Sequence, residues 1–136
     1  MAAELKKATW AARAEPRKPV QCVMLELPAP ISTNQLWSTR SGGGLYSSKR
    51  YRAWLYEAGA VLNSQRPGLV AGPYALTLKV SSAWGGDLDN AVKAVSDLLQ
   101  HHGVIENDRL AQRILIERAD VPGVSVLVVS TAEHSQ

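Results

Sequence analysis

Residues 74–103 read YALTLKVSSAWGGDLDNAVKAVSDLLQHHG and combine two different hydrophobic periods. From Tyr74 to Val80 apolar and polar side chains alternate, which is typical of a half-buried strand. After the break at Trp84-Gly85-Gly86, apolar side chains recur at helical spacing, at Val92, Val95, Leu98 and Leu99. Gly103 is a typical residue just past a helix end. We therefore predict a strand, a glycine-rich corner and a helix from about Asn90 to His102.

The corner between this strand and this helix is acidic. Asp87 and Asp89 are two residues apart, and side chains at that spacing in an extended chain point to the same side. If the helix begins at Asp89, Lys93 lies one turn further on the same face. A third aspartate follows the helix in the turn Glu106-Asn107-Asp108. The sequence therefore predicts a compact acidic cluster with one cation attached.

The remaining elements indicate the fold class. Alternating patterns predict strands at residues 20–27, 111–119 and 124–130, with a hairpin turn signal between the last two at residues 120–123. A helix is predicted from Ser47 or Ser48 to about Ser64, and its buried stripe comprises Tyr51, Trp54, Leu55, Ala58 and Leu62. We predict an α+β fold, a two-layer sandwich of a mixed β-sheet with two main helices on one face.

Length and composition agree with a single domain of 136 residues. We expect a flexible N-terminal extension at residues 1–19, the domain at residues 20–130 and a frayed tail at residues 131–136. Apolar runs of membrane-spanning length and a cleavable leader are not visible, and the single Cys22 cannot form an internal disulfide. These features predict a cytoplasmic protein.

Charge is distributed unevenly along the chain. Residues 1–52 hold nine Lys and Arg against three acids, whereas residues 53–136 hold six against nine. Lys49, Arg50 and Arg52 crowd the first turn of the predicted helix at residues 47–64, where the helix dipole disfavours cations. A bound phosphate would supply the missing negative charge. The pattern favours a polyanionic partner, and a solvated basic surface is the simpler alternative.

Three aspartates without a neighbouring Cys or His form an all-oxygen ligand set, which suits Mg²⁺ or Mn²⁺ and does not suit Zn²⁺. Such an ion promotes phosphodiester hydrolysis, and a lysine such as Lys93 stabilises the crowded phosphate. A purely structural alternative also fits the spacing. In that alternative Asp89 is a helix N-cap, Asp87 is a turn residue, and Lys93 pairs with Asp97 one turn on.

The chain resembles the family of RusA-type Holliday-junction resolvases from about residue 20 to residue 129. The family's Pro-Pro-Ser-x-Asn turn is matched by Pro30-Ile31-Ser32-Thr33-Asn34, and its Tyr-x-Ser-Lys helix start by Tyr46-Ser47-Ser48-Lys49. Its most specific motif, Asp-Leu-Asp-Asn-x-x-Lys, is present at residues 87–93. The motif is followed by a helix, by Gly103-Val104-Ile105 and by the acidic turn at residues 106–108.

This resemblance implies a homodimer that binds four-way DNA junctions and cuts them by paired, metal-dependent nicks. The family's essential carboxylates correspond to Asp87, Asp89 and Asp108, which would hold the metal, and its essential lysine corresponds to Lys93. Supporting roles are expected for Asn34, Asn90 and Asp97. An exposed apolar face on the last two strands is the first candidate for the dimer surface.

The chain departs from the family pattern at three positions. Ile31 replaces a proline, and Asn107 replaces the first acid of a pair, which leaves open whether Glu106 compensates. Trp84-Gly85-Gly86 occupies a stretch that is often basic. We therefore expect the DNA phosphates to be contacted by four other basic residues, namely Arg40, Lys49, Arg50 and Arg52.

The sequence thus favours a structure-selective endodeoxyribonuclease of DNA recombination and repair, working in a bacterial, phage or prophage context. One alternative is a DNA-binding module that keeps the fold and does not catalyse. A second alternative is a metal-dependent phosphodiesterase that acts on RNA or nucleotides. Cleavage of a labelled junction in the presence of Mg²⁺ distinguishes the three functions.

Overall fold

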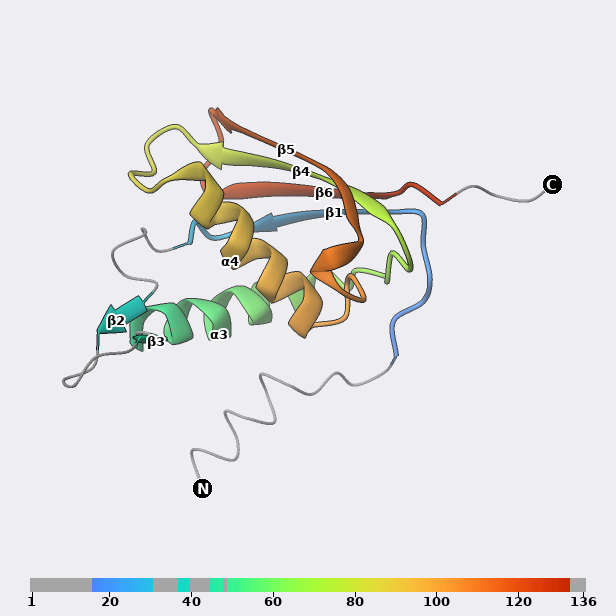
Figure 1. Ribbon diagram of the computed structural model, residues 1–136, viewed down its shortest axis with the longest axis horizontal. Coiled ribbons are helices and arrows are strands. Elements are labelled where there is room, and N and C mark those ends of the chain that lie inside the picture. The colour runs from blue at the N-terminus through green and yellow to red at the C-terminus, as the bar shows by residue number, and fades with distance from the viewer. Residues whose placement is uncertain (1–15, 31–36, 40–44, 48, 133–136) are drawn as a thin grey trace, which may run out of the picture.

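Four strands form one mixed sheet in the order β1-β6-β4-β5 in the computed structural model, which describes residues 16–30, 37–39, 45–47 and 49–132 (Figure 1). The strands are β1 (Cys22–Leu27), β4 (Tyr74–Ser81), β5 (Ala111–Ala119) and β6 (Val124–Ser130). β6 pairs antiparallel with both β1 and β4, and β4 pairs parallel with β5. Two short strands, β2 (Trp37–Thr39) and β3 (Leu45–Ser47), form a separate antiparallel pair.

The predicted hairpin of residues 111–130 is not formed, because β4 lies between β5 and β6. The connecting turn crosses the end of β4, where Ser81 N donates to Gly123 O at 2.9 Å and Ser82 N donates to Ala119 O at 2.9 Å. A turn signal predicts where the chain reverses, but it does not predict which strand becomes the neighbour. Here the valine-rich β6 takes a central position, with Val124, Val126 and Val128 buried.

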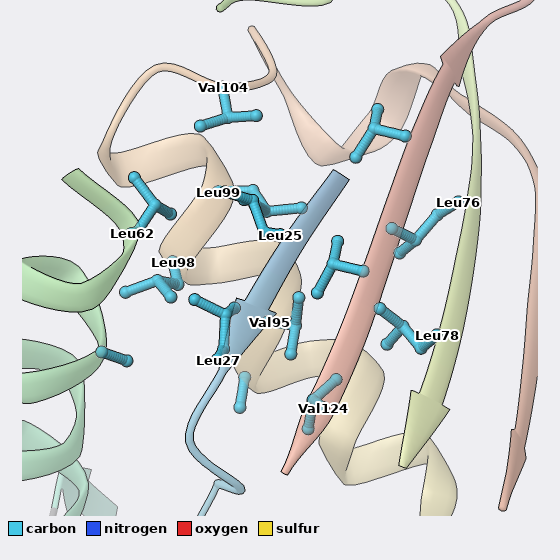
Figure 2. Close-up of a cluster of buried hydrophobic side chains, with 14 of the residues drawn as sticks. Leu25, Leu27, Leu62, Leu76, Leu78, Val95, Leu98, Leu99, Val104 and Val124 are labelled. Carbon is cyan, nitrogen blue, oxygen red and sulfur yellow. The ribbon is translucent and has the colours of Figure 1, made fainter. Parts of the chain in front are cut away.

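Two helices, α3 (Lys49–Ser64) and α4 (Leu88–His101), cover one face of the sheet, as predicted. In the core, Leu25, Leu27, Leu76, Leu78 and Val124 of the sheet face Val95, Leu98 and Leu99 of α4 (Figure 2). The alternation in β1 and β4 explains this arrangement, since every second side chain points to the helix layer. The predicted fold class, a two-layer α+β sandwich with a mixed sheet, is confirmed.

The opposite face of the sheet is open among the described residues. Met24 on β1, Leu115 on β5 and Val129 on β6 are 73%, 52% and 38% exposed. These side chains alternate with the buried ones along their strands. The sheet therefore buries one face inside a single chain and leaves a partly apolar second face.

A polar contact joins the two helices above the core. The Tyr51 hydroxyl at the start of α3 donates to Asp97 Oδ2 on α4 at 3.1 Å, and the Tyr51 ring stacks on Trp54. Burial, followed by the charge and the hydrogen bond of Asp97, raises the pKa of Tyr51 above its usual value. Asp97 thus has a structural role between the helices. Its supporting role at the site stays a prediction.

Residues just before β1 are attached to the domain. The Arg17 guanidinium donates to His102 O at 2.7 Å and to Pro67 O at 3.1 Å, and it also donates to Asn63 Oδ1. Val20 N donates to Leu69 O at 2.8 Å. Residues 17–19, assigned above to the N-terminal extension, therefore make specific contacts with the domain.

Several predicted features lie outside the described residues. They are the first 15 residues of the extension, most of the C-terminal tail, the turn residue Asn34, the basic Arg40 and the candidate N-cap Ser48. Ser47, the other candidate, ends β3, and α3 begins at Lys49. In the described part of the chain, every helix is too short or too polar to cross a membrane.

Removing the hydroxyl group of Tyr51 and that of Tyr74 should change the free energy of unfolding in opposite directions. Tyr51→Phe removes a made hydrogen bond and should lower the free energy of unfolding by about 1 kcal/mol. Tyr74→Phe removes a buried hydroxyl that has no hydrogen-bond partner in the described structure, and it should raise that free energy by about 1 kcal/mol. Urea unfolding at pH 7 measures both changes, and equal losses in the two variants would contradict this assignment.

The raised pKa of Tyr51 makes the free energy of unfolding depend on pH in the alkaline range. Its contribution to stability is complete below the unfolded-state pKa of 10.0 and is lost as the pH rises above that value, because the folded state retains the phenolic proton. Urea unfolding between pH 9 and 11 should therefore show a smaller alkaline loss of stability in Tyr51→Phe than in the wild type. An unchanged slope would show that the folded state does not retain this proton.

Candidate active site

Asp87 and Asp89 lie at the start of α4, and we call this segment, residues 87–89, the acidic corner. The helix begins at Leu88, so Asp87 is its N-cap, with extended φ −80° and ψ 141°, and Asp89 belongs to the first turn. The alternative in which Asp89 is the N-cap is therefore wrong. The Asp87 side chain makes no capping hydrogen bond, and both aspartates are exposed. The positive end of the helix dipole favours carboxylates at this place.

Lys93 and Asn90 accompany the acidic corner on α4. Lys93 is exposed and lies one turn after Asp89, as predicted from the i, i+4 spacing. The Asn90 amide donates to Asp89 Oδ1 at 3.4 Å, a long hydrogen bond between neighbouring side chains. The first two turns of α4 therefore bring together two carboxylates, one amide and one ammonium group.

A residue that sequence reasoning missed holds the loop before the acidic corner. The guanidinium of Arg118, near the end of β5, donates to Trp84 O at 2.6 Å and to Gly86 O at 2.7 Å. These are charge-assisted hydrogen bonds to two carbonyls of one loop, which restrict its movement. The sequence carries no local signal for this contact, because Arg118 is 32 residues from Gly86 and lies in an ordinary exposed strand position.

Trp84 fixes the same loop from its other side. Its indole N–H donates to Pro30 O at 2.5 Å, and its ring lies over Gly86. A Cβ atom added to Gly86 would come within 2.3 Å of that ring. Trp84 and Gly86 thus pack on each other before the acidic corner, and Arg118 brings a positive charge to this loop from β5.

The second acidic segment, Glu106-Asn107-Asp108, is called the acidic turn below. Glu106 Oε1 accepts from Gly72 N at 2.8 Å, so one carboxylate oxygen of Glu106 holds a neighbouring loop. Asn107 caps the short 3₁₀ helix η1 (Asp108–Leu110), and its Oδ1 accepts from Arg109 N at 2.9 Å. Asn107, which replaces an acid of the family pattern, therefore has a capping role in this chain.

Asp108 is not close to the acidic corner within one chain. Its backbone N–H donates to Gln100 Oε1 at 2.9 Å, in the last turns of α4. Asp89 and Gln100 are eleven residues apart, which is about 16 Å along a helix. The path of β5 also shows this separation, because the strand begins next to η1 and Arg118, its next-to-last residue, binds the loop before Asp87 (Figure 1). The described residues contain no group of three or more acidic, His or Cys side chains that could hold a metal ion.

The acidic corner by itself fits part of a magnesium or manganese shell. Asp87 and Asp89 offer only oxygen donors and are open to water. Mg²⁺ is commonly bound through one or two carboxylates, and water or substrate phosphate completes its octahedral shell. The chemistry of this pair agrees with the predicted ion, and Asp108, the third predicted ligand, lies at the other end of α4.

A buried tyrosine lies close to the acidic turn. Tyr74, the first residue of β4, is fully buried, and its hydroxyl has no hydrogen-bond partner among the described residues. Burial, and secondly the negative charge of Asp108, raises the pKa of Tyr74. Asp108 itself is exposed. The carboxylate of Asp108 is thus accessible to solvent, while the neighbouring Tyr74 is buried.

Three of the four predicted DNA-contacting residues are described. Lys49, Arg50 and Arg52 are exposed in the first turn of α3, which contains no acidic residue. α3 and α4 both begin toward the same end of the molecule, on the left in Figure 1. The hydrogen bond between Tyr51 and Asp97 joins this first turn to the middle of α4. The basic helix start therefore flanks the helix that carries the acidic corner.

Two adjacent glycines test the support of the acidic corner. Gly86→Ala forces the Trp84 ring to move and should lower the free energy of unfolding by about 1–3 kcal/mol. Gly85→Ala is the matched control, because a Cβ there meets no atom within 4 Å, and it should leave stability within about 0.5 kcal/mol of the wild type. Urea unfolding measures both, and similar stabilities of the two variants would show that Trp84 does not pack on Gly86.

The family model described as Endodeoxyribonuclease RusA matches residues 28–129. This range includes α3, β4, α4 and β5, and with them both the acidic corner and the acidic turn. A search of curated proteins finds no match. The family match covers most of the 136 residues and agrees with the resemblance seen in the sequence motifs. The chain therefore belongs to the RusA family of endodeoxyribonucleases.

Proposed function

We propose that this protein is a structure-selective endodeoxyribonuclease that resolves four-way DNA junctions by paired nicks, in recombination and repair in the cytoplasm of a bacterial or phage-infected cell. One observation carries the proposal most directly. The family match includes the acidic corner with Lys93 one turn further on, and this corner is exposed at the surface. Membership in a family of endodeoxyribonucleases supports the substrate and the reaction.

The residues of the site suggest a division of roles. Asp87 and Asp89 would hold a divalent cation, Mg²⁺ or Mn²⁺. When bound, this ion lowers the pKa of an attacking water and neutralises negative charge on the phosphate. Lys93, which is exposed one turn after Asp89, would donate hydrogen bonds to the phosphate and stabilise its charge in the transition state. Arg118 and Trp84 keep the corner in one position, which reduces the reorganisation needed during the reaction.

Asp108 enters this scheme through a second copy of the chain. Ligands of one ion lie within about 2.5 Å of it, whereas Asp108 and the acidic corner lie at opposite ends of α4. A symmetric dimer resolves the difficulty if Asp108 of one copy approaches the acidic corner of the other. A two-fold axis then produces two such sites, which suits two nicks in opposed strands of a symmetric junction.

Nicking of a labelled four-way junction with Mg²⁺ tests the activity. The wild type should cut two opposed strands, and Asp89→Asn should reduce the nicking rate by roughly a hundredfold or more, because even indirect supports of a metal ligand cost 10–100-fold. Glu57→Gln is the matched control, since Glu57 is an exposed carboxylate on α3 away from the acidic corner, and it should cut at the wild-type rate.

Binding is measured in the same experiment without metal. Asp89→Asn should still bind the junction with a steep salt dependence, because phosphate contacts by basic side chains dominate affinity. A wild type that binds and never nicks would support the non-catalytic DNA-binding module instead. Faster cleavage of RNA than of the junction would support the RNA phosphodiesterase. Full activity of Asp89→Asn would refute the assigned site.

Mixing two inactive variants tests whether the site is shared between copies. Asp87→Asn and Asp108→Asn should each be inactive alone. In a mixed dimer, one site combines both lesions and the other combines the intact Asp87 and Asp108. Random reassembly makes half of the dimers mixed, so nicking should recover to about a quarter of the wild-type number of sites.

The single-strand nick is the readout for this mixture, because only one of the two sites in a mixed dimer is intact. A mixture of Asp87→Asn and Asp89→Asn is the control. Every acidic corner then carries one of the two substitutions, so no intact site can form and no activity should return. An inactive mixture of Asp87→Asn and Asp108→Asn, after verified exchange of subunits, would show that each chain uses its own Asp108.

A further inference from the structure

Three short segments form a parallel ladder beside the acidic turn, namely residues 18–20, 69–70 and 104–105. Between the first two segments, Leu69 N donates to Lys18 O and Val20 N donates to Leu69 O, both at 2.8 Å. On the other side of the middle segment, Val70 N donates to Val104 O at 2.9 Å. The chain before β1 is therefore the outer member of a ladder whose inner member continues directly into the acidic turn.

The Arg17 guanidinium binds the ladder at the end where all three segments begin. Its Nε donates to His102 O at 2.7 Å, and a second nitrogen donates to Pro67 O at 3.1 Å. Pro67 precedes the middle segment, His102 precedes the third, and Arg17 itself precedes the first. Because hydrogen bonds from a charged donor are stronger than those from a neutral one, this side chain holds the three segments together.

The same guanidinium also joins the ends of the two helices. It donates to Asn63 Oδ1 in the last turn of α3, and Asn63 Nδ2 lies 3.3 Å from Nδ1 of His102, the C-cap of α4. Since the Asn63 oxygen accepts from Arg17, the Asn63 nitrogen donates to the His102 ring. The last turn of α3 contains no basic residue. Arg17 thus places a positive charge where the helix dipole favours one.

The first and middle segments of the ladder are in close contact at Gly68. A Cβ atom added to Gly68 would come within 2.6 Å of Lys18 O and of a methyl group of Val20. The missing side chain therefore allows the chain before β1 to pack directly on the backbone of this loop.

The acidic turn is attached to both structures that Arg17 binds. Glu106 Oε1 accepts from Gly72 N at 2.8 Å, which attaches the turn to the loop that contains the middle segment. Asp108 N donates to Gln100 Oε1 at 2.9 Å, which attaches it to the end of α4. A change at Arg17 would therefore affect both attachments.

We propose that Arg17 is a positioning residue for the acidic turn and, through this turn, for the carboxylate of Asp108. The consequence for catalysis rests on the proposed function, in which Asp108 takes part in the reaction. Hydrogen-bonded supports keep such a carboxylate in its productive orientation. Arg17 lies before residues 28–129, so the inferred role belongs to a part of the chain outside the range that the family model matches.

Arg17→Met and Gln65→Met form a matched pair of variants. Each replaces a polar side chain that makes several hydrogen bonds near the end of α3 by an apolar side chain of similar length. The Gln65 side chain accepts from Glu26 N at 2.9 Å and donates to Glu26 O at 2.8 Å. It therefore holds the edge of β1 and makes none of the ladder's hydrogen bonds.

Amide hydrogen exchange of the full chain, without DNA or metal, tests the positioning. Arg17→Met should speed the exchange of the Val70 and Gly72 amides by about tenfold or more, because their acceptors belong to the ladder and to the acidic turn. Gln65→Met should instead speed exchange at Glu26 and leave Val70 and Gly72 as in the wild type.

The amide of Leu78, a fully buried residue of β4, reports global unfolding in the same spectra. In Arg17→Met its exchange should change less than that of Val70 and Gly72, because the inferred effect is local. Equal acceleration at all three amides would mean a general loss of stability and would overturn the proposal. Unchanged exchange at Val70 and Gly72 would overturn it as well.

Two further variants separate the geometry of the contact from its charge. Arg17→Lys keeps the positive charge and loses the planar fork that reaches several acceptors, so it should share the faster exchange of Arg17→Met. Gly68→Ala keeps Arg17 and forces the first segment away from the middle one, so it should also speed exchange at Val70. Wild-type exchange in either variant would contradict the positioning role.

Nicking of the four-way junction tests the consequence for catalysis. Arg17→Met and Arg17→Lys should both nick about tenfold more slowly than the wild type, since loss of a support behind a metal ligand costs 10–100-fold. Gln65→Met should nick at the wild-type rate. Wild-type nicking by Arg17→Lys would show that only the charge matters, and an equal loss in Gln65→Met would show that stability alone matters. Either result would overturn the inferred role in catalysis.

The exchange and nicking experiments fail independently of each other. If the wild type does not nick, the proposed function falls, and the exchange rates still decide whether Arg17 positions the acidic turn. If exchange at Val70 and Gly72 is faster in Arg17→Met but nicking is unchanged, the structural role stands and its consequence for Asp108 is refuted.

Discussion

The structure depends on the burial of α4 against the sheet between two parallel strands, β4 and β5. A parallel pair needs a crossover connection, and here the crossover is α4 with its apolar stripe of Val95, Leu98 and Leu99. The helix thereby acquires a fixed direction, with its start next to the end of β5 and its end next to the beginning of β5. Every functional group on this connection is placed by that one packing arrangement.

The same constraint separates the candidate ligands. Asp87 and Asp89 precede and begin α4, and Asp108 follows it, so a straight helix keeps them apart. A shorter connection would bring the carboxylates together in one chain but would leave less apolar surface to cover the sheet. The fold thus separates the carboxylates of the acidic corner from Asp108 by the length of α4.

Side-chain hydrogen bonds hold the loops that connect the helices and strands. Arg118 and Trp84 hold the loop before the acidic corner, Glu106 holds the loop at Gly72, and Asn107 caps η1. Each contact satisfies backbone groups that strands and helices leave without a partner. The sheet edge at Glu26 follows the same rule, since the Gln65 side chain donates to Glu26 O and accepts from Glu26 N.

Much of the fold was determined by the sequence itself, because hydrophobic periods are local. Hydrophobic patterns identified the secondary-structure elements, the faces they bury and the fold class. These patterns are the alternation in β1, β4, β5 and β6 and the helical stripes of α3 and α4. The motif at residues 87–93 identified the acidic corner and the family. These signals are read from residues at most a few positions apart, so they need no knowledge of the tertiary structure.

Only the tertiary structure decided which strands are neighbours and how far apart the acidic segments lie. β4 lies between β5 and β6 because the crossover and the central burial of β6 outweigh a turn signal at residues 120–123. The contact of Arg118 with the loop before Asp87 joins residues more than 30 positions apart, and Asp108 lies a helix length from Asp89. Such long-range relations depend on how the elements pack, and local patterns along the chain do not encode that packing.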